Sequence, residues 1–182
     1  MIIGVTGTNG AGKGTVVDYL VKNKGFAHFS ARGFITEEIL RRGLEVNRDN
    51  TNLVANDLRK IYHPAYIAEQ LFEQASAKGD NAIIESIRTV GEAEFLKSKS
   101  ALIWAVDADR KVRYERSVLR GSDLDKISFE KFCEQEDREM DQKEKFDMNI
   151  KGVMAMADHI FTNNGTQEEL FAQIEEALQG VE

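Results

Sequence analysis

The chain has 182 residues, a length typical of one globular domain that buries a core of its own. Of these residues 42% are hydrophobic, 30% are charged and only one is proline, which excludes a disordered or low-complexity chain. The net charge of −7 and the pI near 5.1 argue against a general nucleic-acid binder, which needs a surplus of lysine and arginine, but they leave room for a local basic cleft.

The first predicted strand, Ile2 to Thr6, runs directly into a glycine-rich segment, GTNGAGKGT, at residues 7–15. Apolar residues then repeat at helical spacing until Gly25 ends the pattern. The segment fits G-x-x-x-x-G-K between a strand and a helix, the context in which this Walker A pattern forms a phosphate-binding P-loop. The residues predicted to bind ATP here are Gly7, Asn9, Gly10, Ala11, Gly12, Lys13, Gly14 and Thr15.

Each part of this loop has a physical role in holding phosphates. Glycines let the backbone turn and approach the oxygens closely, so that N–H groups of the loop and of the helix start can bind an anion near the positive end of the helix dipole. Lys13 adds a positive charge that can follow the β and γ phosphates toward the transition state.

Gly14 stands where serine or threonine usually touches Mg²⁺, and Thr15 follows it. The sequence GKGT resembles the loop of adenylate-kinase-like nucleoside monophosphate kinases. In that family the metal is held largely through water and the threonine reaches the α phosphate. The resemblance therefore implies an α-phosphate contact for Thr15 and few direct protein ligands to Mg²⁺.

The second predicted strand, Ala27 to Ser30, is followed by a region at about residues 31–78 that we expect to cover the acceptor. Within it, the run from Leu53 to Ala77 is typical of helix, and Pro64 should break or kink it after His63. Several polar side chains here are possible contacts for an acceptor phosphate or base, although most should be ordinary surface groups. They are Arg32, Arg42, Arg48, Asn52, Asn56 and Arg59.

The third predicted strand, Ala82 to Glu85, ends in the sequence ESIR. A carboxylate at the end of a parallel strand lies where open α/β sheets bind ligands. Glu85 would therefore order the waters of Mg²⁺ or orient an acceptor. The alternative is that Glu85 is a polar residue at a strand end that simply meets solvent. ESIR resembles the DG-x-x-R segment of monophosphate kinases, which implies that Arg88 holds the phosphate of the acceptor.

After the fourth predicted strand, Ala101 to Asp107, three arginines fall on one helix face: Arg113, Arg116 and Arg120. The next segment, Gly121 to Glu144, is dense in charge and contains Arg138. It is either a solvated helical hairpin or a mobile lid at about residues 120–140. Positive groups beside a lid would neutralise charge in phosphoryl transfer, whereas arginines on a solvated helix would not.

The last predicted elements are a strand, His159 to Thr162, and an amphipathic helix from Leu170 to Leu178. The alternation of strands and helices predicts an α/β fold: a three-layer P-loop NTPase, with a parallel five-stranded sheet, helices on both faces, an acceptor helical region and a short lid. We expect residues 1–182 to form one domain. The histidines show no metal-ligand spacing, and His28 and His159, inside strands, are expected to be packed.

The segments VDADRKVRYERSVLR, DRE and MADHIFTNNG resemble the second half of dephospho-coenzyme A kinases and of related archaeal P-loop kinases. The resemblance implies that Arg116, Arg120 and Arg138 contact ATP phosphates and that Asn163 and Asn164 lie near the adenine. On the acceptor side, the dephospho-coenzyme A kinases that the chain resembles carry the sequence DAD after the second strand, with an aspartate as the base for a hydroxyl acceptor. This chain reads HFSARG at that place and has no aspartate there. Ser30 instead resembles the residue that opens the acceptor helix in monophosphate kinases.

These patterns predict an ATP- and Mg²⁺-dependent kinase that phosphorylates a small phosphorylated acceptor, most simply a nucleoside or deoxynucleoside monophosphate. Two alternatives remain: a dephospho-coenzyme A kinase, and an ATP-switched regulatory ATPase that binds a macromolecular partner. The single cysteine, the absence of an apolar run of roughly 20 residues and a start without a basic segment predict a cytoplasmic protein that binds neither membrane nor, in general, nucleic acid.

Overall fold

The computed structural model describes residues 1–121, 127–140 and 146–180, apart from the side chain of Arg120. Its strands are β1 (Ile2–Gly7), β2 (Ala27–Ser30), β3 (Ala82–Glu85), β4 (Leu102–Asp107) and β5 (His159–Thr162). Its helices are α1 (Lys13–Lys24), α2 (Ala31–Arg41), α3 (Arg48–Ile61), α4 (Tyr66–Lys78), α5 (Val90–Ser98), α6 (Arg110–Arg120), α7 (Phe129–Met140), α8 (Ile150–Ala155) and α9 (Gln167–Gln179).

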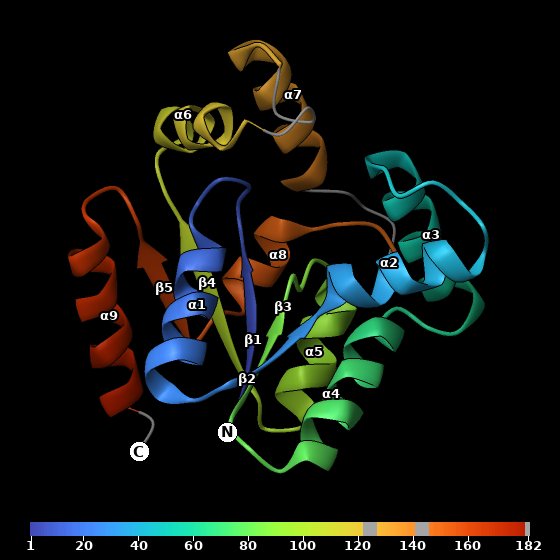
Figure 1. Cartoon of the computed structure of the whole chain (residues 1–182), viewed down its shortest axis with the longest axis horizontal. Coiled ribbons are helices and arrows are strands. Elements are labelled where there is room, and N and C mark those ends of the chain that lie inside the picture. Colours follow the sequence, from blue (N-terminus) through green and yellow to red (C-terminus); the bar gives the residue numbers. More distant parts are fainter. Residues whose placement is uncertain (122–126, 141–145, 181–182) are drawn as a thin grey trace.

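The strands form one parallel sheet in the order β2-β3-β1-β4-β5, with β1 in the centre (Figure 1). The predicted five-stranded parallel sheet is therefore confirmed, and the predicted strand bounds differ from the observed ones only at Gly7 and Leu102. In the register of the sheet, Glu85 pairs with both Val5 and Ser30. The carboxyl ends of β1, β2 and β3 thus meet at one edge.

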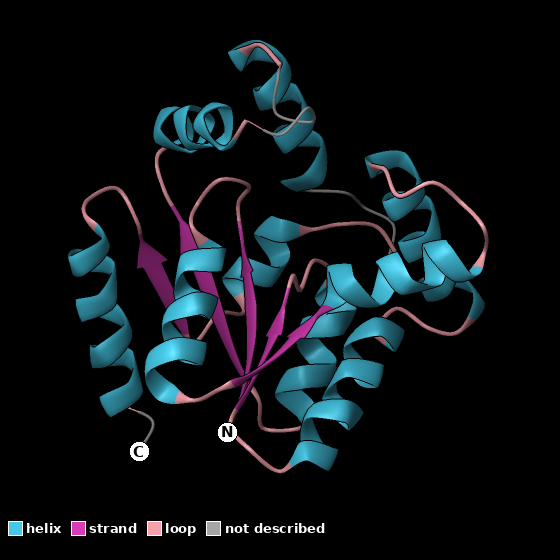
Figure 2. Cartoon of the chain, viewed as in Figure 1, coloured by secondary structure: helices cyan, strands magenta, loops and turns pink. Residues whose placement is uncertain are grey.

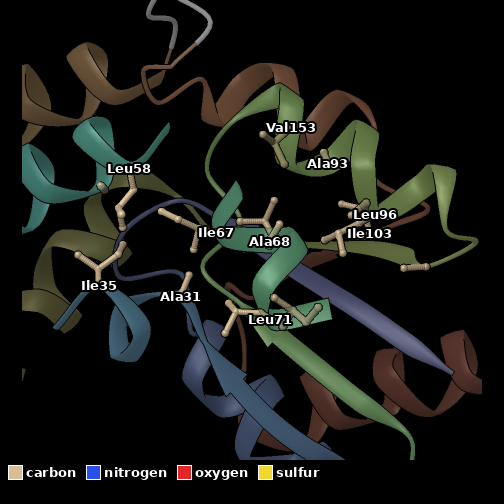
Figure 3. Close-up of a cluster of buried hydrophobic side chains, with 14 of the residues drawn as sticks. Ala31, Ile35, Leu58, Ile67, Ala68, Leu71, Ala93, Leu96, Ile103 and Val153 are labelled. Atoms are coloured by element: carbon tan, nitrogen blue, oxygen red, sulfur yellow. The ribbon is translucent and has the colours of Figure 1, made fainter. Parts of the chain in front are cut away.

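The two faces of the sheet bury different side chains because successive residues of a strand point to opposite sides. On one face Ile3, Val5 and Ile83 pack against α1 and α9. On the other face Ile84 and Ile103 pack against α4, α5 and α8 (Figure 3). Figure 2 shows helices on both sides of the sheet. Burial on both sides explains why these strands are continuous apolar runs in the sequence.

The predicted acceptor region consists of α2, α3 and α4. As expected, Pro64 separates two helices, but α3 begins at Arg48 rather than near Leu53. The earlier start has a local cause, because the Asn47 side chain accepts a hydrogen bond from the N–H of Asn50 and caps the helix. Figure 3 shows Ile35 of α2 and Leu58 of α3 in the same apolar cluster as Ile67 of α4.

Helices α6 and α7 lie beyond the carboxyl ends of the strands (Figure 1). Phe132 of α7 is 4% exposed and packs against Tyr114 of α6, so α7 is not a fully solvated helix. Residues 122–126 of the predicted lid, and 141–145 beyond it, lie outside the described residues. Among the helices that the structure describes, none combines the length and apolar character needed to cross a membrane.

Candidate functional site

The glycine-rich segment forms a tight turn between the end of β1 and the start of α1, and two of its glycines are required by geometry. Gly7 has a φ of +133°, and a Cβ there would lie 2.0 Å from the carbonyl oxygen of Val106. Gly12, which precedes α1 with a φ of +100°, would bring a Cβ to 2.3 Å from Asn163 Nδ2. The turn therefore depends on residues without side chains at both ends.

Lys13 is the first residue of α1, and its side chain folds over the loop. Its Nζ donates hydrogen bonds to the carbonyl oxygens of Gly7 (3.0 Å) and Thr8 (2.7 Å). Gly14 is exposed with open space around its Cα, whereas Thr15 is half-buried. The lysine charge is thus held at the mouth of the loop, at the positive end of the α1 dipole.

Asp107, the last residue of β4, ties the loop to the neighbouring strand. Its Oδ1 accepts hydrogen bonds from the Thr8 hydroxyl (2.6 Å) and from the Ala108 N–H (2.9 Å). Sequence reasoning did not single out this residue, although a carboxylate at the end of the strand next to β1 was the available signal.

The predicted adenine-side asparagines make structural contacts to the same loop. The buried Asn163 donates from Nδ2 to the carbonyl oxygen of Ala11 (2.8 Å), and its own carbonyl oxygen accepts from Arg116 (2.8 Å). Asn164 Oδ1 accepts from the N–H of Asp109 (2.7 Å). Both side chains are therefore beside the P-loop and the start of α6, and their contact with adenine stays a prediction.

Glu85 is the last residue of β3, so its side chain lies at the carboxyl end of the sheet, close to the P-loop and Arg88. Its Oε2 is 3.0 Å from Nε2 of His28, and this hydrogen bond, together with the nearby charges of Lys13 and Arg88, holds the pKa of Glu85 below its usual range. The carboxylate is thus fixed in its ionised form. The prediction that His28 is packed is wrong: the ring is about one-third exposed because it reaches along the sheet surface toward Glu85. His159, by contrast, packs against Trp104.

Arg88 is oriented from its backbone by a helix cap. The N–H groups of Arg88 and Thr89 both donate to Glu92 Oε2, at 2.9 and 3.1 Å. Upstream, Ser86 has a φ of +74°, which non-glycine residues rarely adopt. The turn after β3 therefore aims the guanidinium of Arg88 away from the sheet, where NH1 approaches Met148 Sδ at 3.6 Å.

The arginines of the acceptor region divide into structural and accessible groups. Arg59 is 2% exposed and its guanidinium binds Glu92, at 2.8 Å from NH2, so it forms a buried structural ion pair rather than an acceptor contact. Arg42 is bound by Glu38 and Asp57, and Arg32 is exposed on α2. Asn56 donates to Asp147 (3.2 Å) and accepts from Arg59 (3.4 Å). Arg48 and Asn52 of α3 face α7, where they line a cleft of about 160 Å³ together with Arg138.

The arginines of α6 have different surroundings. Arg113 is 5% exposed, and its guanidinium forms a buried ion pair with Glu136 of α7 and donates to the carbonyl oxygen of Asn9 in the loop. Burial lowers the pKa of Arg113, but an arginine stays charged at neutral pH. Arg116 turns toward Asn163, and the side chain of Arg120 lies outside the described part of the structure.

These residues fit a nucleotide with Mg²⁺. The loop presents backbone N–H groups at a helix start beside Lys13, and Glu85 is an ionised carboxylate of the type that Mg²⁺ prefers. In the described part of the chain, no group of three or more His, Cys, Asp or Glu side chains could hold a metal ion.

Solved structures share this fold. The chain is similar over its whole length to TT1252 from Thermus thermophilus, with 98% of that chain covered, a TM-score of 0.64 and 20% identity. It is also similar to a shikimate kinase from Acinetobacter baumannii in complex with shikimate, with a TM-score of 0.62, 13% identity, and 99% and 92% of the two chains covered. At these identities the similarity shows the P-loop kinase fold alone.

Sequence similarity identifies the family. A family model described as "AAA domain" matches residues 3–165. UPF0200 protein TK1334 of Thermococcus kodakarensis is 31% identical over 188 aligned positions, which cover 100% of this chain and 98% of that protein. The chain therefore belongs to the AAA domain family and to the UPF0200 proteins.

Proposed function

We propose that this protein is an ATP-dependent kinase that transfers the γ-phosphoryl group of ATP to a nucleoside or deoxynucleoside monophosphate. One observation carries the proposal: the carboxylate of Glu85, held by His28 at 3.0 Å, stands at the carboxyl end of β3, beside the end of β1 that leads into the P-loop and three residues before Arg88. The P-loop kinase fold of the neighbours supports phosphoryl transfer to a small molecule.

This proposal gives each predicted site residue a role. Lys13 and the loop N–H groups, with Thr15, would hold the phosphates of ATP, while Arg88 would hold the phosphate of the acceptor. Arg116, Arg120 and Arg138 would neutralise charge in the transition state. Bound Mg²⁺ supplies positive charge to the transferred group, and Glu85 would orient its water ligands.

The charge state of Glu85 favours a phosphate over an alcohol as the acceptor group. An alcohol must lose a proton on attack, so its kinase profits from a general base whose pKa lies near the working pH. The pKa of Glu85 is lowered instead, which makes this carboxylate a weak base. A phosphate monoester is already largely deprotonated at neutral pH and needs no such base.

The decisive experiment measures ADP formation from Mg-ATP with each ribo- and deoxynucleoside monophosphate and with dephospho-coenzyme A. One monophosphate should stimulate ADP formation strongly. Lys13→Ala should lower kcat by about 100-fold or more, as expected for the loss of a charge-stabilising group.

The acceptor side is tested by Arg88→Ala, which should raise the KM for the acceptor while the affinity for ATP persists. Lys60→Ala, which removes a positive charge from an exposed position on α3, is the matched control and should behave as wild type. Stimulation by dephospho-coenzyme A alone would identify that kinase instead, and a slow ATPase indifferent to every acceptor would indicate a regulatory switch.

A further inference from the structure

Glu139, near the end of α7, lies between two arginines that face the acceptor side. One carboxylate oxygen, Oε1, accepts a hydrogen bond from Arg48, and the other, Oε2, lies 3.9 Å from NH1 of Arg88. We infer that Glu139 is an internal mimic of the acceptor's phosphate: it occupies the anion site formed by Arg48 and Arg88, and an incoming phosphate must displace it.

The surroundings of the three side chains distinguish this arrangement from a structural ion pair. In the structural pair of this chain, Arg59 and Glu92, the side chains are 3% and 1% exposed. The Arg48 and Arg88 side chains are 34% and 38% exposed, so they are far less enclosed than that pair, although burial lowers the pKa of the Arg88 guanidinium.

The contact of Arg88 with Glu139 is also incomplete. At 3.9 Å it is longer than a charge-assisted hydrogen bond, and NH1 of Arg88 donates to the weakly accepting sulfur of Met148 at 3.6 Å. A guanidinium offers five donors in a planar fork suited to the oxygens of phosphate. A phosphate would therefore engage Arg88 more fully than the present carboxylate does.

Space for such a ligand lies beside the carboxylate. The cleft of about 160 Å³ is lined by Arg48 and Arg138, by the carboxylates Glu139 and Asp49, and by Asn52, Gln135 and Met148. Once Glu139 is displaced, two arginines face the one remaining carboxylate, so the cleft can take a phosphate monoester whose remaining part extends along α3. The identity of that monoester as a nucleotide rests on the proposed function, whereas the displacement of Glu139 does not.

Helix α7 is linked to the P-loop through Arg113 of α6. One turn before Glu139, Glu136 is bound by Arg113, which in turn donates to the Asn9 carbonyl oxygen of the P-loop. This contact holds α7 against α6 one turn before Glu139. The Glu139 side chain can therefore be displaced while α7 stays in place on α6.

The test measures the binding of inorganic phosphate by calorimetry at constant ionic strength, with Mg-ADP in excess to fill the P-loop. If Glu139 occupies the arginines about nine-tenths of the time, Glu139→Gln should bind phosphate about tenfold more tightly than wild type. Glu134→Gln makes the same charge change at an exposed position of α7 and should leave phosphate affinity unchanged. Combining Glu139→Gln with Arg88→Ala should abolish the gain.

Phosphate affinity that is equal or weaker in Glu139→Gln would overturn the inference, because Glu139 would then merely support the arginines. If Glu139→Gln does not fold, Glu139→Asp takes its place. The shorter aspartate side chain cannot span both arginines, so we expect an intermediate gain in phosphate affinity. No gain in phosphate affinity would likewise overturn the inference. Tighter phosphate binding by Glu139→Gln, without phosphorylation of any monophosphate, would uphold the role of Glu139 and reject the proposed kinase. Acceptor-dependent kinase activity, with a phosphate affinity and an acceptor KM that Glu139→Gln leaves unchanged, would uphold the kinase and reject the role of Glu139.

Discussion

Gly12 and Gly14 stand two residues apart in the P-loop segment, yet their surroundings predict opposite responses to alanine. A Cβ at Gly12 would sit at a φ of +100° and 2.3 Å from Asn163 Nδ2, whereas a Cβ at Gly14 meets nothing within 4 Å. Gly12→Ala should therefore break the Asn163 contact to the loop and weaken Mg-ADP binding by about tenfold or more, ~1.4 kcal/mol. Gly14→Ala should keep the affinity and add up to ~1 kcal/mol of stability, since alanine favours helix.

Calorimetric titration of both variants with Mg-ADP checks the affinities, and chemical denaturation checks the stabilities. Equal affinities in the two variants would contradict the structural requirement at Gly12. The comparison is informative because the two changes add the same methyl group to the same loop.

Also at the scale of single residues, His28 governs the ionisation of Glu85. The hydrogen bond from His28 is the main cause of the lowered pKa of Glu85, so the carboxylate stays ionised below its ordinary pKa of 4.5. Its contribution to stability is present above that value and is lost as the pH falls through the folded-state pKa. In His28→Ala the pKa of Glu85 should rise toward the ordinary value, and the acid loss of activity should begin at higher pH.

A carboxyl-carbon NMR titration of Glu85 measures this change directly. His63→Ala is the matched control, since His63 also pairs with a glutamate, Glu69 at 2.7 Å, on a different element. A Glu85 pKa that is the same in wild type and His28→Ala would show that Lys13 and Arg88 alone set it.

At the scale of elements, one buried carboxylate joins α3 to the start of α5. Glu92 is 1% exposed, caps α5 through the N–H groups of Arg88 and Thr89, and binds the guanidinium of Arg59. Glu92→Gln leaves the Arg59 charge without its partner, so we expect a loss of about 3 kcal/mol or more. For a chain of this size that loss lowers Tm by ~6–12 °C.

Thermal unfolding of Glu92→Gln and of Glu94→Gln, an exposed glutamate on the same helix, tests this expectation. The control should unfold within about 2 °C of wild type, because surface substitutions usually change stability by less than ~0.5 kcal/mol. Equal Tm values for the two variants would mean that Glu92 does not join the elements energetically.

The ion pair of Arg113 with Glu136 joins α6 to α7 and, through Asn9, to the P-loop. Both side chains are about 5% exposed, so Glu136→Gln should destabilise the protein by about 3 kcal/mol. It should also raise the KM for ATP, because the guanidinium contacts the loop backbone. The control in both the denaturation and the kinetic measurement is Asp137→Asn, at an exposed neighbouring position bound by Arg110. If Glu136→Gln leaves the KM for ATP unchanged, the ion pair of α7 does not affect ATP binding by the P-loop.

At the scale of the whole molecule, the sheet and the P-loop were predictable because their signals are local in the sequence. A strand buried on both faces is an apolar run, and the loop is a contiguous motif. The pairs Arg113 with Glu136 and Arg48 with Glu139 were not predictable, since their members lie 23 and 91 residues apart and share no periodicity. The burial of Phe132 and Glu136 disfavours the solvated hairpin, one of the two interpretations that the charge density of residues 121–144 left open.

The prediction of a single domain can be tested, because the acceptor region and the sheet share an apolar core. Ile35, Leu58 and Ile67 of the acceptor region share one cluster with Ile84 and Ile103 of the sheet, so the region cannot unfold without exposing the core beneath it (Figure 3). Trp104, the single tryptophan, is fully buried in β4 against α1 and α9, on the opposite face. Trp104 fluorescence and helix ellipticity in urea should therefore give the same midpoint, and Mg-ADP should raise both equally. An ellipticity transition that precedes the fluorescence transition would show that α2, α3 and α4 unfold as a separate unit.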